Sequence, residues 1–270
     1  MKRQPALMTL ILICASLLSV YGRRSLLAQR GTASALIREE QSITIDGVAE
    51  VWRLEWRTPP IPFCSAQEGP PTCACDGFAY GESGDLDLVR MRNGREIERL
   101  SLGKLFSDFY KHKAVVQRWQ PTESDVEKYV PGNRQEFAAE IRKRLIAKVM
   151  NFGDYDHDGQ ATEFFIQTES LACGHQYGVV VGVSERNPRL HAFGTALHPA
   201  KPLQLKPHEW QALLNTSGPV RVVDLHCADH GSETEIELQL YATADGIRVN
   251  KREFECTEKG RGRLIKRSTE

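Results

Sequence analysis

The run Asp154-Tyr155-Asp156-His157-Asp158-Gly159 constrains the fold more than any other stretch of this chain. It places carboxylates at alternate positions, and carboxylates this close repel one another unless a cation neutralises them. A hard divalent cation requires oxygen ligands that converge from a tight loop, and the final glycine permits the sharp turn that wraps the backbone around the ion. We therefore predict a calcium site in this loop. The alternative is an Asp-rich surface turn without metal.

Four residues of this run match positions one, three, five and six of an EF-hand calcium loop: Asp154, Asp156, Asp158 and Gly159. Gln160 at position seven would contribute its backbone carbonyl, and Thr162 at position nine a hydroxyl or a bridging water. Position twelve, where an EF-hand has a bidentate Glu, is Phe165, and Glu163 stands earlier, at position ten. The predicted metal ligands are Asp154, Asp156, Asp158, Gln160, Thr162 and Glu163.

The loop resembles the wider DxDxDG group of calcium loops. In the FG-GAP and VCBS repeats of that group the loop runs directly into a strand, as Glu163-Phe164-Phe165-Ile166 would here. In periplasmic sugar-binding proteins the last acid comes from elsewhere in the chain, and Glu163 and Glu169 are local candidates. The resemblance covers about a dozen residues. It implies structural calcium binding in an extracytoplasmic protein. Because position twelve has no acid, we expect a modest dissociation constant of about 10⁻⁴ to 10⁻³ M.

The first 28 residues have the pattern of a secretory signal peptide. Lys2 and Arg3 form a positive segment, and the apolar run from Ala6 to Val20 is shorter than the roughly 20 residues of a transmembrane helix. Cleavage could follow Gly22 or Ala28, and an uncleaved membrane anchor is the alternative. We expect a secreted or periplasmic protein, because the overall character of the sequence is typical of secreted bacterial proteins.

Export makes disulfides the expected state of the cysteines beyond the leader, which are even in number. These are Cys64, Cys73, Cys75, Cys173, Cys227 and Cys256. The most local pairing joins Cys64 to Cys73 or Cys75. A bond between Cys227 and Cys256 would tie the last strands together. Spacing alone does not decide between these and the other possible pairings.

The pattern of apolar residues predicts an α+β fold: a single β-rich domain over 37–257 with one main helix before the calcium loop. That helix spans Asn133 to Met150, where apolar residues recur every three or four positions and Asn133 is a candidate N-cap. Asp46-Gly47 and Asn93-Gly94 predict hairpin turns. Short apolar runs after Thr162 predict further strands, with a short helix from His208 to Leu214. Residues 258–270 are predicted to be a basic flexible tail.

A second cluster of metal-binding residue types lies at His226, Asp229 and His230. These residue types ligate zinc, and the segment is similar to the HxHxDH motif of metallo-β-lactamase-like hydrolases. However, Cys227 stands where that motif has a His. A zinc-dependent hydrolase is therefore the alternative to our first hypothesis, a non-enzymatic binding or structural module stabilised by calcium and disulfides. The chain has no G-x-S-x-G, P-loop or Rossmann motif, and no other catalytic constellation.

The balance of charge gives no reason to expect a polyanionic partner for the chain as a whole. The 270 residues carry 35 basic and 35 acidic side chains, so the formal net charge is zero. Nucleic acids and anionic membranes attract proteins with an excess of positive charge. We expect a protein or polysaccharide partner of unknown identity, no nucleic acid, and no membrane contact beyond the signal segment.

Overall fold

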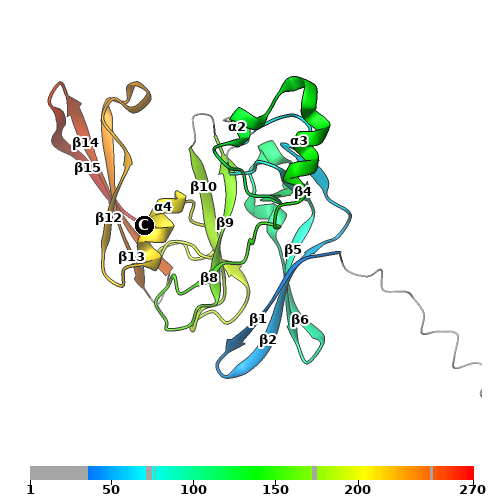
Figure 1. Cartoon of the computed structure of the whole chain (residues 1–270). Coiled ribbons are helices and arrows are strands. Elements are labelled where there is room, and N and C mark those ends of the chain that lie inside the picture. Colours follow the sequence, from blue (N-terminus) through cyan, green and yellow to red (C-terminus); the bar gives the residue numbers. More distant parts are fainter. Residues whose placement is uncertain (1–35, 71–74, 76, 172–174, 244–245) are drawn as a thin grey trace, which may run out of the picture. The chain divides into compact units, whose positions relative to one another are not determined.

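A computed structural model describes residues 36–270 except 71–74, 76, 172–174, 244–245 and the side chain of His230 (Figure 1). The predicted signal peptide, Cys73 and Cys173 lie outside the described residues. Those from Leu36 to Glu270 belong to one unit. Among them, no helix has both the length and the apolar character that crossing a membrane requires.

The fold is mostly β, so the predicted α+β class is wrong. Strands account for 48% of the residues and helices for 15%, and the strands form four antiparallel sheets. The first sheet has the order β1-β2-β5-β6, with the bounds Leu36–Ile45, Val48–Trp56, Leu86–Arg92 and Arg95–Ser101. Its two hairpin turns are those predicted. Positive φ angles at Asp46 (50°), Gly47 (77°), Asn93 (51°) and Gly94 (73°) explain the choice of residues, since such turns favour Asn, Asp and Gly.

The second sheet is small and precedes the helical segment. Its order is β3-β4-β7, with the bounds Ile61–Phe63, Gly81–Gly84 and Ala114–Gln117. Two 3-10 helices, η2 (Leu102–Leu105) and η3 (Asp108–Tyr110), lie between β6 and β7. The Cys64–Cys75 disulfide closes the loop between β3 and β4, which selects Cys75 over Cys73 as the partner of Cys64.

The predicted main helix is much shorter than the apolar pattern suggests. After α2 (Asp125–Lys128) and η4 (Pro131–Asn133), helix α3 covers only Arg134–Ile141. Asn133 makes no side-chain cap; its carboxamide oxygen instead accepts a hydrogen bond from the Val130 amide at 3.0 Å.

Contacts with distant segments end α3 at Ile141. Arg144 turns back to a buried carboxylate, with 2.5 Å between its Nη2 and Asp125 Oδ1. Ile146 forms a bridge with Trp119 instead of continuing the helix. Leu145, which the helical pattern places on the core face, is 90% exposed. Tertiary pairing therefore overrides the local helical preference.

The third sheet includes β8 and β9, the two strands that flank the predicted calcium loop. Its order is β11-β10-β9-β8, with the bounds His191–Ala192, Gln176–Gly182, Glu163–Ser170 and Phe152–Gly153. Helix α4 (Pro207–Leu214) confirms the predicted helix. Both faces of the sheet are buried. Phe164 and Val179 pack in one core cluster with Trp52, while Val180 packs in a second cluster with Trp210.

The fourth sheet has the order β12-β13-β14-β15. Its strands span Val220–Leu225, Thr234–Thr243, Gly246–Thr257 and Gly260–Thr269, with the 3-10 helix η6 (Asp229–Gly231) between the first two. The prediction of a flexible basic tail is not met, because this segment is strand β15, paired antiparallel with β14. The predicted disulfide between Cys227 and Cys256 is present.

Candidate metal site

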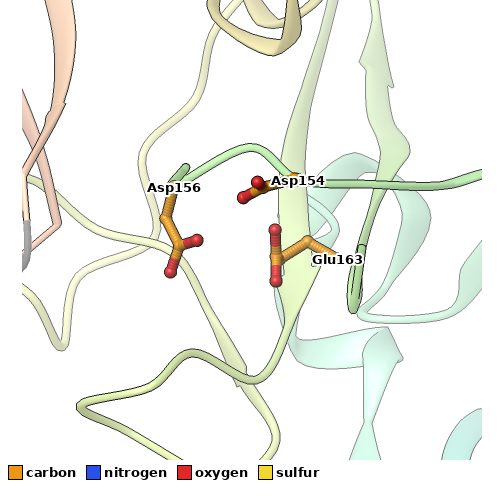
Figure 2. Close-up of side chains that lie close together, drawn as sticks. All are labelled: Asp154, Asp156 and Glu163. Atoms are coloured by element: carbon orange, nitrogen blue, oxygen red, sulfur yellow. The ribbon is translucent and has the colours of Figure 1, made fainter. Parts of the chain in front are cut away.

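Three acidic side chains meet where the chain passes from β8 to β9. Asp154 and Asp156 belong to the connecting loop, and Glu163 is the first residue of β9. One carboxylate oxygen from each lies within 4.8 Å of the other two. Figure 2 shows the three carboxylates gathered around a common space. Such a group could hold a metal ion.

Hydrogen bonds between Asp side chains and following backbone amides give the loop its curl. They join Asp154 Oδ2 to Gly159 N (3.1 Å), Asp156 Oδ1 to Asp158 N (3.1 Å), and Asp158 Oδ1 to Gln160 N (2.8 Å). Two residues have positive φ, His157 at 58° and Gly159 at 93°. The glycine therefore serves the turn that the sequence predicts for it.

Glu163 is fully buried and held by two hydrogen bonds. Its Oε2 accepts from the Tyr155 amide at 2.8 Å, and its Oε1 accepts from the Thr162 hydroxyl at 2.6 Å. Gly182, its partner on β10, leaves room for this arrangement. A Cβ at position 182 would lie 2.4 Å from the Thr162 carbonyl oxygen and 2.8 Å from the Glu163 Cα. The backbone around the acid is thus closely packed.

The site is electrostatically strained without a cation. Burial raises the pKa of Asp156 to about 7, and the charges of Asp158 and Asp154 add to the effect. Burial likewise raises the pKa of Glu163 to about 9, with a further contribution from Asp156. Asp154 Oδ1 is buried and has no hydrogen-bond partner among the described residues. A cation would relieve the repulsion between the carboxylates, and Asp154 Oδ1 could coordinate it.

The other predicted ligands lie outside this group of three acids. Asp158 Oδ2 accepts a hydrogen bond from the Glu185 amide at 2.8 Å. The Gln160 carboxamide exchanges two hydrogen bonds with Asp46, at 3.0 and 3.2 Å. The Thr162 hydroxyl is 3.0 Å from the Val183 carbonyl oxygen as well as bonded to the buried Glu. These side chains tie the loop to the β1–β2 turn and to the segment after β10.

Two further contacts anchor the loop to helix α4. The His157 Nε2 atom is 2.8 Å from the Leu213 carbonyl oxygen. The Tyr155 ring meets Trp210 edge to face, with 6.1 Å between ring centroids. At position twelve of the loop, Phe165 packs against the second core cluster instead of offering a ligand. The sequence contains no signal that locates these anchors, because each depends on residues far along the chain.

The alternative zinc cluster is not brought together among the described side chains. His226 is exposed, Asp229 is half-buried in η6, and Cys227 is engaged in its disulfide. The side chain of His230 lies outside the described atoms. Among the described residues, only Asp154, Asp156 and Glu163 form a group of three or more His, Cys, Asp or Glu side chains close enough to share a metal ion.

Comparison with protein-family models, with curated proteins and with solved structures finds no match to this chain. The site must therefore be interpreted from its own geometry. The two disulfides fit an extracytoplasmic location, because such bonds persist in oxidising compartments.

Proposed function

We propose that this protein is a calcium-binding, non-enzymatic structural or binding module. The observation that carries the proposal is the convergence of Asp154, Asp156 and Glu163 around one space, with a buried Asp154 oxygen that lacks a partner among the described residues. The side-chain atoms that could coordinate the metal are all carboxylate oxygens, which suit hard cations such as Ca²⁺ better than zinc or copper. The DxDxDG pattern of the loop supports the same choice.

The ion would act by fixing the start of β9. The loop contacts the β1–β2 turn through Gln160, the segment after β10 through Asp158, and helix α4 through His157. A ligand that binds only the folded state stabilises that state by an amount that grows with the logarithm of the ratio of ligand concentration to dissociation constant. Calcium would therefore stabilise the junction of several sheets rather than take part in a reaction.

Export is part of the proposal. An extracytoplasmic protein meets calcium at concentrations that suit a site with a dissociation constant of about 10⁻⁴ to 10⁻³ M. The predicted leader and the two disulfides agree with this location. Loss of calcium from such a site would lower the free energy of unfolding of the protein.

The test is a thermal melt of the mature protein in calcium, in chelator, and in zinc after chelation. We expect calcium to raise the melting temperature and Asp156→Ala to abolish that rise. A rise with zinc alone, without a response to calcium, would reject the proposal. It would redirect attention to the cluster at His226.

A further inference from the structure

The solvent face of the fourth sheet carries more cations than anions. On β13 this face alternates with Leu238 and Leu240, which pack in the core cluster that includes Trp210 of α4. Cross-strand pairs and ion pairs place four arginines on the solvent face: Arg248, Arg252, Arg261 and Arg267. The acids that accompany them there are Glu235 and Glu237. The face therefore has a local excess of positive charge, although the whole chain has none.

A surface hollow of about 350 Å³ lies across β13, β14 and β15. Its described lining includes no acid, and the lining residues whose side chains belong to the solvent face are Gln239, Asn250, Arg252, Arg267 and Thr269. Arg252 lies directly opposite Arg267 in the strand register. Like charges in that position repel one another, so an anion bound between them would be stabilising.

Two of the arginines are held in place before any ligand arrives. Arg252 and Arg261 lie over the Phe254 ring, at 5.3 and 4.4 Å from its centroid. Each donates a 2.9 Å hydrogen bond to Glu237. Arg252 Nε is buried with no acceptor among the described residues, and Arg267 makes no ion pair among them. Pre-oriented guanidinium groups lose little entropy when they bind a carboxylate or a sulfate.

The spacing of the polar groups favours an extended ligand. Arg248 and Arg252 are four residues apart on β14, which corresponds to about 13 Å along a strand. One small anion cannot reach both, whereas a polymer can. Between them, Gln239, Asn250 and Thr269 form a row across the three strands that can exchange hydrogen bonds with sugar hydroxyls.

We propose that this face binds an acidic polysaccharide, through its carboxylate or sulfate groups and its hydroxyls. On this face the half-buried ring of Tyr241 is covered by Arg248, whose guanidinium carbon lies 5.5 Å from the ring centroid. The face therefore lacks, among its described residues, the open aromatic platforms on which nucleic-acid bases stack. The proposal does not depend on the metal site, which lies at the β8–β9 junction.

The experiment measures binding of a size-defined heparin oligosaccharide to the mature protein at about 0.15 M salt. We expect Arg267→Gln to weaken binding about tenfold, the loss typical of one charge-assisted hydrogen bond. The matched control is Arg263→Gln, which removes the same charge from the same strand. Arg263 is 81% exposed and pairs with Glu255, whose side chain alternates with Phe254 and so belongs to the opposite face.

Three results would overturn the proposal. Equal weakening by both substitutions would show attraction to general positive charge and not to this face. Single-stranded DNA of matched length that binds as tightly as heparin would reject the saccharide assignment. Absence of saturable binding in a protein that melts cooperatively would reject the site itself. Because both arginines are exposed, each variant is expected to melt within a few degrees of the parent.

Discussion

Replacing Glu163 by Gln should reduce calcium stabilisation by at least about 1 kcal/mol while leaving the metal-free fold intact. With a dissociation constant of about 10⁻⁴ to 10⁻³ M, about 10 mM calcium stabilises the folded state by about 1.4 to 2.7 kcal/mol. For a chain of this size that corresponds to a rise in melting temperature of about 3 to 11 °C. Losing one of three carboxylates should weaken binding at least about tenfold, which reduces the gain to at most about 0.4 kcal/mol for the weaker constant and at most about 1.4 kcal/mol for the tighter one.

The metal-free structure should tolerate this change because glutamine has the same shape. Its carbonyl oxygen can accept from the Tyr155 amide, as Glu163 Oε2 does at 2.8 Å. Its amide nitrogen can donate to the Thr162 hydroxyl, which can turn to donate to the Val183 carbonyl oxygen 3.0 Å away. We therefore expect the free energy of unfolding in chelator to change by less than about 1 kcal/mol.

Differential scanning fluorimetry in 10 mM calcium (about 10 times the weaker expected constant) and in chelator makes the comparison. Glu169→Gln is the matched control, since it removes the same charge from the same strand outside the acid group. A calcium shift as large in Glu163→Gln as in the parent, or one that falls equally in Glu169→Gln, would refute the reasoning.

Three further predictions concern pH, packing and the disulfide. The pKa of Glu163 is raised from 4.5 to about 9, so its contribution to metal-free stability is fully present below pH 4.5 and lost as pH rises toward 9. Melts in chelator should therefore fall from about pH 5 to about pH 8, and calcium should oppose the fall; a flat profile would contradict this. Urea unfolding should show a cost of about 2 to 5 kcal/mol for Ile141→Ala, which is fully buried, and below about 0.5 kcal/mol for Leu145→Ala, which is 90% exposed. Equal costs would favour the longer helix. Removing the Cys227–Cys256 bond by a double Ala substitution should cost about 2 to 4 kcal/mol in the same assay, and no change would show that the bond is dispensable.

Local features of the fold could be predicted because their causes are local. Asp46-Gly47 and Asn93-Gly94 form the predicted hairpin turns because these residues tolerate positive φ. Helix α4 follows from its own apolar spacing and from Pro207 at its first position.

The incorrect predictions of secondary structure involve segments whose contact partners are distant in sequence. The apolar pattern of 133–150 is helical in period, yet Arg144 turns to Asp125 and Ile146 pairs with Trp119. Likewise, the basic residues of 258–270 resemble a solvated tail. Arg261 instead pairs with Glu235 and Glu237, and the segment completes a sheet. Neither pairing can be read from composition or period.

The candidate site was predictable in part for the same reason. The DxDxDG spacing places Asp154 and Asp156 close together, because the loop curls on its own hydrogen bonds. The place of Glu163 depends on the register of β9 with β8 and β10, which the sequence does not reveal. EF-hand spacing suggested that Asp158 would also be a ligand, whereas it lies outside the group and binds the Glu185 amide.

The most direct test of the metal site is a crystal structure of the mature protein grown in calcium, with the ion located by its anomalous scattering. We predict one peak within about 2.3 to 2.6 Å of oxygens from Asp154, Asp156 and Glu163. A fully calcium-exchanged crystal with no peak in this space, or with calcium bound only elsewhere, would contradict the account.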